Sequence, residues 1–550
     1  FVTDQVSDRC RPDDGYRVAA LQGSLTVPAG GEAVLHVVLG QEADEHGVRE
    51  RLAALRRTDD AAAALERTRA WWRETLGKLR VETDSPAFDR LVNRWLPYQV
   101  LTARLWGRLG PHQRSGAYGF RDQLQDVLPL IVLAPGAARA QILKHCRRQF
   151  LEGDVFQWWH DTWDGRTGLG MRNRASDPHL WLPYVTALYV AGSGDTAILD
   201  EAVPFLEGRD IPPGDEGLAF VPRVSRDVAP VYEHCLRAIN LTLGRLGPGG
   251  LPRMGSGDWN DGLSAVGPHG RGTSTWLGFF LHDVLRRFIP IVRAREGELR
   301  AGRYETQAQR LRTALDVMWR EDRYLRAVTD QGRALDFADA LCSSWPVLSG
   351  AAGPERGERA LTAGLSRLER DNMVLLLAPP FDDDSDPWPG RIALYPRGVR
   401  ENGGQYSHGA SWLVDALAEL ARAAGEAGDE AGAERWRERA LEVWLKISPL
   451  AHATAEEMPR YGLPPHQQPA DIYAGPGREG RGGWSWYTGA AARMLWAAYA
   501  LLGLRPAGGG LELVPGFTRR CGVLNLRRVR FAGRDVLPPP EGEADPQVDW

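Results

Sequence analysis

The feature that most constrains this chain is a succession of amphipathic segments between about residues 85 and 505. Apolar residues recur there at spacings of three and four with polar residues between them, a pattern that predicts helices with one buried face. Little strand signal interrupts them. The clearest predicted helices have the sequences PAFDRLVNRWLPYQVLTARLWG, ARAQILKHCRRQF, STWLGFFLHDVLRRFIPIVRARE, YETQAQRLRTALDVMW, GASWLVDALAELARAAGEAG, AERWRERALEVWLKI and YTGAAARMLWAAYALLG.

This succession predicts a closed arrangement of paired helices. Paired helices over such a length form either a solenoid or a closed barrel, and a solenoid has a fixed sequence period that this chain lacks. The predicted fold class is therefore mainly α, with a barrel of helical hairpins over residues 85–505. We expect the long loops to bring the functional residues to one mouth of this scaffold.

The flanking segments predict smaller units. Residues 1–44 have alternating apolar positions around a Pro-Ala-Gly-Gly turn, which predicts the end of an N-terminal β-sandwich. Residues 45–84 are charged and rich in Ala and Leu, which predicts a helical linker. Residues 506–550 predict a small C-terminal β domain and a frayed tail. Because Phe1 begins in what resembles the middle of a domain, we expect the chain to be part of a longer polypeptide.

Composition argues against several classes of function. The formal net charge of -4 and the absence of a Lys/Arg stripe argue against a nucleic-acid surface. No apolar run reaches the roughly 18 residues of a membrane span, and the chain does not start with a signal-peptide pattern. The 5 cysteines are dispersed and form no CxxC, which predicts reduced thiols in a cytoplasmic protein. Several of the 20 tryptophans lie in polar, glycine-bearing stretches such as QWWHD and GGWSWYTG, which favours carbohydrate binding over core packing alone.

The stretch RSGAYGFRDQLQDVL leads from glycines into a predicted helix that opens with Arg121 and Asp122. Asp122 and Asp126 lie one turn apart, a like-charge pair that would cost a few tenths of a kcal/mol on an exposed helix. A solvated helix face is the simple alternative. The neighbouring Leu and Val residues predict a packed helix instead, so that Arg121 and Asp122 are candidates for binding sugar hydroxyls.

The stretch GSGDWNDGL places Asp258, Trp259, Asn260 and Asp261 between glycines. A plain turn is the simple alternative, because Asp and Asn side chains bond their own backbone. A calcium loop is excluded, because Gly262 comes one position too early and no Glu closes the loop. A carboxyl beside an indole can be desolvated, which raises its pKa and allows it to act as an acid. The other carboxyl would stay ionised and shape the turn.

Two further motifs open predicted helices and are candidate anion sites. His408 lies at the start of one helix in RENGGQYSHGASW, and Thr488 and Gly489 open another in GRGGWSWYTGAA. Helix N-termini and imidazoles favour phosphate, although a lone histidine is more often structural. The GPGREG sequence lacks the βαβ context of a dinucleotide site, and FDDDSDPW is more typical of a solvated loop than of a metal site.

Together these motifs resemble those of the glycoside hydrolase family 94 phosphorylases. The most similar members are the carboxy-terminal region of cyclic β-1,2-glucan synthases and the 1,2-β-oligoglucan phosphorylases. The resemblance implies a trailing β-sandwich, a helical linker, an (α/α)6 barrel and a small C-terminal β domain. It departs from the family pattern at LPPHQQP, where we expect altered acceptor binding. The resemblance is based on AYGFRDQLQD, EGDVFQWWH, RNRASDPHLWLP, GSGDWNDGLSAVGPHGRGTSTWLG, GVRENGGQYSHGASW and GRGGWSWYTGAA.

The resemblance also implies roles for single residues. Asp261 matches the general acid, and Glu401 matches an acceptor-side contact. The implied sugar-binding residues are Arg121, Asp122 and Trp259, and the implied phosphate-binding residues are His408, Thr488, Gly489 and Arg114. The implied reaction is reversible, inverting phosphorolysis of β-linked gluco-oligosaccharides, β-1,2-glucan above all, which gives α-glucose 1-phosphate. Inorganic phosphate is the co-substrate, and no metal or organic cofactor is implied.

Two alternatives remain open at this point. One is an inverting glycoside hydrolase on the same barrel. The other is a non-catalytic or weakly catalytic glucan-binding or chain-length-control segment of a larger cyclic glucan synthase. The expected partners are a β-glucan oligosaccharide and phosphate, without nucleic acid and without a membrane span. Members of the resembled family are often dimers, which leaves a homodimer open.

Overall fold

The computed structural model describes residues 24–42, 44–55, 58–108, 110, 115–162, 165–514 and 519–540. The chain divides into two compact units, Phe1–Trp72 and Arg73–Trp550. The first unit contains helix α1 (Glu45–Ala54) and most of helix α2 (Thr58–Gly77), as the predicted linker requires. Residues 24–42 contain a turn but no assigned strand, and residues 1–23 lie outside the described residues. The N-terminal β-sandwich therefore stays a prediction.

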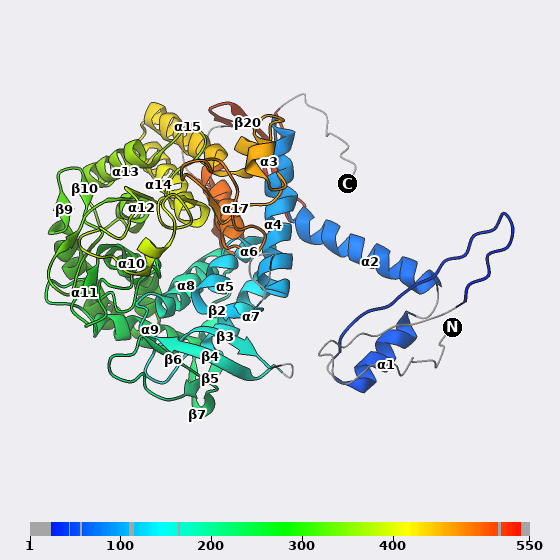
Figure 1. The fold of residues 1–550 in the computed structure, drawn as a ribbon, viewed down its shortest axis with the longest axis horizontal. Helices are drawn as coiled ribbons and strands as arrows, with labels where there is room; N and C mark the ends of the chain where they lie inside the picture. Colours follow the sequence, from blue (N-terminus) through cyan, green and yellow to red (C-terminus); the bar gives the residue numbers. More distant parts are fainter. Residues whose placement is uncertain are drawn as a thin grey trace. The chain divides into compact units, whose positions relative to one another are not determined.

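The second unit is mainly helical, as predicted, and six of its helices contact one another in a closed ring. These ring helices are α5 (Phe120–Asp126), α8 (Trp181–Ser193), α10 (Thr275–Glu296), α12 (Ala340–Ser349), α14 (Ser407–Glu426) and α17 (Ala490–Leu501). Figure 1 shows them around the centre of this unit, with a second layer of helices outside. The outer layer contains η1 (Leu91–Trp95), α4 (Leu96–Gln99), η2 (Val100–Gly107), α7 (Pro135–Cys146), α9 (Val231–Leu243), α11 (Glu298–Asp316), α13 (Pro354–Leu368) and α15 (Glu430–Ile447).

The two layers differ in burial as their sequences predict. The ring helix α14 is buried on all sides through its first three turns, because neighbouring helices surround it. The outer helix α13 buries Leu361, Leu365 and Leu368 on one face and leaves its charged face exposed. Side chains cap the N-terminal ends of two ring helices, α10 and α12. Ser274 Oγ accepts from the Leu277 N–H at 3.0 Å, and Asp339 accepts from the Cys342 N–H at 2.9 Å.

Strands cover part of the region in which we predicted little strand. β3 (Phe156–Asp161) pairs with β4 (Thr167–Asn173), and β5 (Ala202–Glu207) pairs with β7 (Arg223–Pro230). That part of the prediction was wrong, because buried and exposed residues do not alternate regularly along strands such as β3 and β7. β3 also pairs with β2 (Tyr118–Gly119), which leads directly into α5. The sheet thus lies beside the start of a ring helix.

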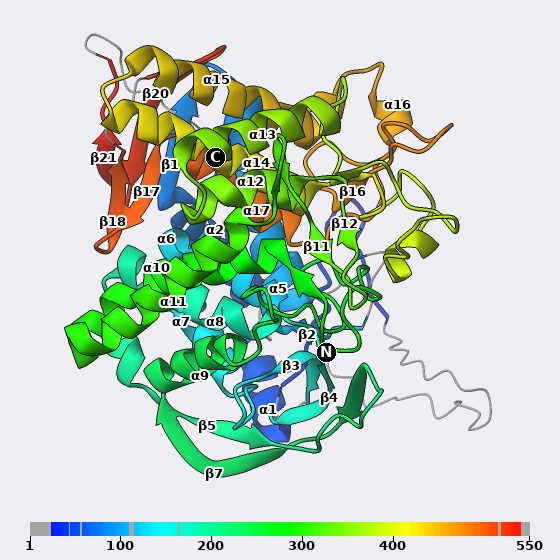
Figure 2. The same ribbon diagram turned by 90° about the vertical axis from the view of Figure 1, so that its left-hand side faces the viewer.

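The predicted C-terminal strands are present. They are β17 (Leu504–Ala507), β18 (Gly510–Leu513), β19 (Arg520–Cys521), β20 (Leu524–Phe531) and β21 (Arg534–Leu537). β1 (Leu79–Thr83) pairs antiparallel with β20, so the end of the predicted helical linker is a strand, in which alternate residues are buried. Figure 2 shows these strands on one side of the ring and β12 (Ala334–Leu335) and β16 (Asp471–Ile472) on the other. Among the described helices, none is both long enough and apolar enough to cross a bilayer.

Candidate functional site

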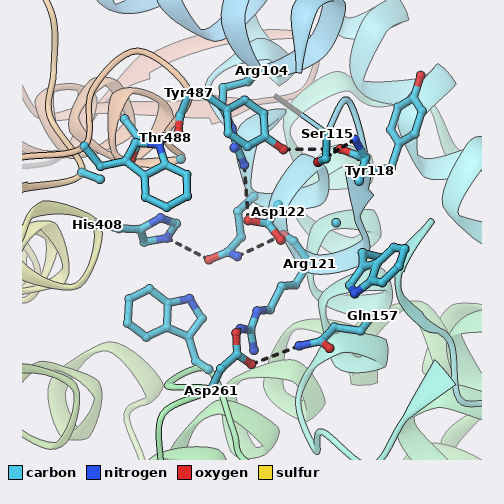
Figure 3. A pocket seen from close by; sticks show the side chains of 18 of the residues that line it. Arg104, Ser115, Tyr118, Arg121, Asp122, Gln157, Asp261, His408, Tyr487 and Thr488 are labelled. Carbon is cyan, nitrogen blue, oxygen red and sulfur yellow. Dashed lines mark hydrogen bonds and ion pairs between the residues drawn. The ribbon is translucent and has the colours of Figure 1, made fainter. Parts of the chain in front are cut away.

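A cavity of about 560 Å³ lies where ring helices α5, α14 and α17 begin. It is lined by every predicted site residue except Arg114, which lies outside the described residues. Figure 3 shows Asp261 and Thr488 on opposite sides of this cavity. The ring brings distant motifs together because each precedes or opens a ring helix. The predicted residues in the lining are Arg121, Asp122, Trp259, Asp261, Glu401, His408, Thr488 and Gly489.

The turn that bears Asp261 is fixed by the fully buried Asp258. Arg326 donates to its two carboxylate oxygens at 2.7 and 2.8 Å, and the Ser274 hydroxyl donates to one of them at 2.6 Å. The Asn260 N–H donates to the same carboxylate at 3.0 Å. Asp258 is therefore the carboxyl that shapes the turn, as predicted, and it leaves Asp261 free to face the cavity.

Asp261 extends its carboxyl group into the cavity, and its side chain is 50% exposed. One carboxylate oxygen accepts from Arg121 at 2.6 Å, and the other accepts from the Gln157 amide at 3.2 Å. Desolvation by the cavity walls raises the pKa of Asp261 above its usual range, although Arg121 opposes the shift. This environment favours a carboxyl group that retains its proton more readily than an ordinary aspartate.

Arg121 is shared between two carboxylates. Its other terminal nitrogen donates to Asp177 at 2.7 Å, and Asp177 also accepts from the Trp181 indole at 2.9 Å. Burial raises the pKa of Asp177 to about 6, with Arg121 opposing it. The negative charge of Asp177 thus offsets part of the positive charge that Arg121 presents to Asp261.

The indole of Trp259 connects the Asp261 turn to the start of α14. Trp259 is only 7% exposed, and its ring centroid lies 4.7 Å from that of Trp412 and 5.1 Å from that of His408. Its edge still lines the cavity. The aromatic side chain therefore forms part of the cavity wall that runs from the candidate acid to the candidate anion site.

His408 is held in one tautomer by Gln125. The Gln125 amide nitrogen donates to the Arg121 carbonyl at 3.0 Å, so its oxygen is the acceptor for His408 Nε2 at 2.9 Å. Burial lowers the pKa of His408 well below its usual value, and nearby arginines add to the shift. His408 is then a neutral imidazole whose Nδ1 is an acceptor. A side-chain carbon placed on Gly489 would lie 3.0 Å from this nitrogen.

The permanent cation beside this imidazole is Arg104, which sequence analysis missed. Its guanidinium donates to Asp126 at 2.8 Å and to Asp122 at 3.4 Å, and lies 4.1 Å from the centroid of the Tyr487 ring. Burial raises the pKa of Asp126 to about 7, with Arg104 opposing it. A solvated helix face is therefore excluded for the fully buried Asp126, whereas Asp122 lines the cavity with half of its side chain exposed. Arg104 lies within the ordinary helical pattern of η2, so no local signal distinguished it.

The side of the cavity that contains Glu401, the predicted acceptor contact, is held by Asp471, another residue that sequence analysis missed. Its carboxylate accepts from the Arg400 N–H at 3.1 Å and from the Trp484 N–H at 2.8 Å. It thus joins the segment that contains Glu401 to the segment that leads to Thr488. Glu401 itself accepts from the Arg400 side chain at 3.2 Å.

The unusual LPPHQQP segment packs on the outer helices. His466 packs against Trp95 with ring centroids 4.4 Å apart and the rings tilted by 40°, and the Gln468 N–H donates to Gln99 at 2.9 Å. The described cavity lining includes Ala470 but no residue of this segment. Any effect on acceptor binding must therefore act through the neighbouring chain.

Metal-binding chemistry finds no support in the described part of the chain. It contains no group of three or more His, Cys, Asp or Glu side chains placed to hold an ion. Its cysteines are buried and unpaired with one another. They are Cys146, Cys235, Cys342 and Cys521.

Comparisons with known proteins agree with the motifs. A family model described as the glycosyl hydrolase 94 superfamily, catalytic domain, matches residues 71–503. The chain is 40% identical over 514 residues to the cyclic beta-(1,2)-glucan synthase NdvB of Rhizobium meliloti, a match that covers 91% of this chain and 17% of that protein. It is 27% identical over 535 residues to the solabiose phosphorylase of Paenibacillus borealis, covering 93% of this chain and 62% of that enzyme. A 1,2-beta-oligoglucan phosphorylase of Listeria innocua is 25% identical over 264 residues, covering 46% of this chain and 22% of that enzyme. The chain thus spans less than two thirds of the length of each of these relatives.

Proposed function

The chain belongs to the glycosyl hydrolase 94 superfamily, and on this premise we propose that it is an inverting phosphorylase of β-linked gluco-oligosaccharides. Phosphate would attack the anomeric carbon of the terminal glucosyl unit and give α-glucose 1-phosphate. We propose β-1,2-glucan as the substrate, in line with the names of two of the relatives. The observation that carries the proposal is one cavity with a candidate acid on one side and, on the other, the start of α17 together with His408 and the guanidinium of Arg104.

Asp261 is the proposed general acid. An inverting enzyme needs a protonated carboxyl beside the glycosidic oxygen, and the raised pKa of Asp261 meets that requirement. Its proton passes to the glycosidic oxygen as the bond to the anomeric carbon breaks, so the departing sugar leaves with a free hydroxyl. Trp259 excludes water from one side of the reaction, which favours phosphate as the nucleophile.

The opposite wall is the proposed phosphate site. The start of α17 offers backbone N–H groups next to Thr488 and Gly489, and Arg104, a guanidinium that Asp122 and Asp126 share, lines the same wall. The neutral His408 accepts a hydrogen bond from a protonated oxygen of the phosphate through Nδ1, so it adds no second cation. A carboxylate base to activate water is not required here, because phosphate is already an anion. The roles of Arg121 and Asp122 in sugar binding, and of Glu401 on the acceptor side, are part of the same proposal.

We further infer that the ring of helices is an (α/α)6 barrel. The closed order of contacts among the six ring helices supports this, as does the outer helix that packs against each of them. Such a barrel would explain why the site residues come from helix starts along the whole second unit.

Replacing Asp177 by Asn should move the alkaline limb of the pH–rate profile to lower pH by about one unit. Without the Asp177 charge, the full charge of Arg121 favours the ionised form of Asp261, so its pKa falls. The protonated acid is then lost at a lower pH as the pH rises. The measurement is kcat/KM against pH for both proteins.

The matched control is Asp154→Asn. Asp154 is also buried and accepts two hydrogen bonds from one arginine, Arg172, at 2.8 and 2.7 Å, but it does not line the cavity. Its alkaline limb should stay where it is in the unaltered protein. An unmoved limb in Asp177→Asn would contradict the proposed charge balance.

Replacing Gly489 by Ala should raise the KM for phosphate by about tenfold or more and change saccharide affinity little. The added methyl group would lie 3.0 Å from His408 Nδ1 and 3.4 Å from a carboxylate oxygen of Asp126, so it would occupy the anion site. The backbone φ of -66° accepts alanine without strain. The control is Gly302→Ala, where an added carbon meets nothing within 4 Å. An unchanged KM for phosphate would contradict the proposal that Gly489 lies at the phosphate site.

The function itself is tested by phosphate dependence. A panel of β-linked gluco-oligosaccharides, with and without phosphate, should release α-glucose 1-phosphate only when phosphate is present. Loss of the glycan at the same rate without phosphate would favour an inverting hydrolase instead. The β-1,2-linked member of the panel should react fastest.

A second candidate function is a glucan-binding or chain-length-control segment of a larger synthase. The observation that favours it is the 40% identity to a cyclic glucan synthase, because the match covers only 17% of that protein. Comparing the unaltered chain with Asp261→Asn separates the two functions. Glucan binding in both proteins with turnover in neither would support this second function.

A further inference from the structure

A second cavity, of about 450 Å³, lies within the same ring of helices but away from the candidate active site. The ring helices line the first cavity with their starts and this one with later turns. Helix α14 contributes His408 to the first cavity and Arg422 to the second. Gly489, which directly precedes α17, lines the first cavity, and Tyr499 of α17 lines the second. The strand β17, which also lines the second cavity, lies in Figure 2 on the side of the ring away from β16. The two cavities therefore occupy opposite ends of the ring.

The lining of the second cavity is rich in aromatic side chains, some of which have polar atoms without partners. The aromatic residues are Tyr184, Trp345, Trp412, Trp496 and Tyr499. Among the described residues, Trp345 Nε1, Tyr499 Oη and one carboxylate oxygen of Asp415 are buried and have no hydrogen-bond partner. Buried polar groups in folded proteins are nearly always paired. These three atoms therefore point to a partner that the chain does not itself supply.

Each arginine in the lining is already paired with a carboxylate. Arg286 and Arg287 both donate to Asp283, at 2.5 and 2.9 Å. Arg422 donates to Glu419 at 2.5 and 2.8 Å, and Arg505 donates to Glu512 at 3.2 Å. The lining carboxylate of Asp415 is paired with Arg493, which lies behind the lining. An anion would have to displace these carboxylates. The lining thus favours a neutral ligand with many hydrogen-bonding groups over a phosphate ester.

We propose that this second cavity is a binding site for a neutral saccharide. Its volume lies within the roughly 300–1,000 Å³ range of ligand pockets. Aromatic rings pack against the apolar faces of a pyranose, while paired carboxylates and guanidinium groups bond its hydroxyls. The site does not depend on the catalytic proposal, because none of its lining residues lines the first cavity.

The indole of Trp412 connects this site to the active-site cavity. It lines the second cavity, and its ring centroid lies 5.4 Å from that of His408 and 4.7 Å from that of Trp259. A saccharide seated against Trp412 therefore contacts the same aromatic cluster that borders the phosphate site.

The test is calorimetric titration of the purified chain with β-1,2-linked glucose disaccharide in the absence of phosphate. Two binding events per chain are expected. Arg121→Ala should remove the event at the first cavity only, and Trp496→Ala should weaken the other at least tenfold. Tyr499→Phe should also weaken it, because it removes only a hydroxyl that has no partner within the chain. A purely structural role of Tyr499 would not give this loss of affinity. Thermal unfolding of each variant is the check that it is folded.

The outcomes distinguish this site from the catalytic one. A single binding event that Arg121→Ala abolishes would overturn the second site and leave the catalytic proposal intact. Binding at the second cavity without any turnover at the first would support the site and refute the proposed function. Binding of glucose 1-phosphate but not of the disaccharide at the second cavity would overturn the neutral class of ligand.

Discussion

Replacing Asp261 by Asn is expected to lower the turnover of unactivated gluco-oligosaccharides by about 10²- to 10⁴-fold. Asparagine keeps the size of the side chain, and its one carbonyl oxygen can still accept from Arg121, but its amide nitrogen cannot accept from Gln157 and it has no acidic proton to give to the glycosidic oxygen. Saccharide affinity should change much less than kcat. The measurement is the initial rate of α-glucose 1-phosphate release at saturating phosphate.

A substrate with an activated leaving group separates acid catalysis from misfolding. An aryl β-glucoside needs little protonation of its leaving group, so Asp261→Asn should lose far less activity on it than on the oligosaccharide. Asp384→Asn, on an exposed loop, is the matched control and should behave like the unaltered chain. Equal losses on both substrates would contradict a proton-donating role for Asp261.

Sequence analysis predicted most of the candidate site because its residues belong to compact motifs at helix starts. Thr488 and Gly489 were recognisable as candidate anion-binding residues, because they open a helix directly after the glycine and aromatic residues of GRGGWSWYTGAA. The turn predicted different tasks for its two carboxyls, and the family resemblance identified Asp261 as the acid; the contacts of Asp258 with Arg326 agree with that division.

The residues that were missed act from the middle of regular elements. Arg104 and Gln125 lie in helices, and Gln157 lies in β3, so their sequence neighbours suggest only secondary structure. Their importance follows from tertiary contacts that no local pattern encodes. The strand β1 was missed for a related reason, because its partner β20 lies at the far end of the chain.

The mainly helical fold was predictable because outer helices such as α13 bury a single face at regular spacing. Closure of the ring was inferred only from the absence of a repeat. The contacts that close it, between α17 and α5, join segments that local periodicity cannot relate. Periodicity therefore identifies the helices, whereas long-range packing decides which of their ends form the cavity.

Replacing Arg326 by Met is expected to destabilise the fold by about 3–5 kcal/mol. The Arg326 side chain is completely buried and pairs with two buried carboxylates, at 2.7 Å with Asp258 and 3.2 Å with Asp339. Methionine fills a similar space but leaves both carboxylates without a counter-charge. The free energy of unfolding should be measured by urea titration of the unaltered and altered chains.

The matched control for this experiment is Arg333→Met. Arg333 pairs with both oxygens of Asp386 at the surface, and exposed pairs contribute about 0–1 kcal/mol. Adding Asp258→Asn to Arg326→Met should recover part of the lost stability, because one uncompensated charge is then removed. A cost for Arg326→Met no larger than that of the surface control would contradict the view that this buried pair fixes the turn. Since that turn positions Asp261, activity and stability should both fall in Arg326→Met. Neither should fall in Arg333→Met.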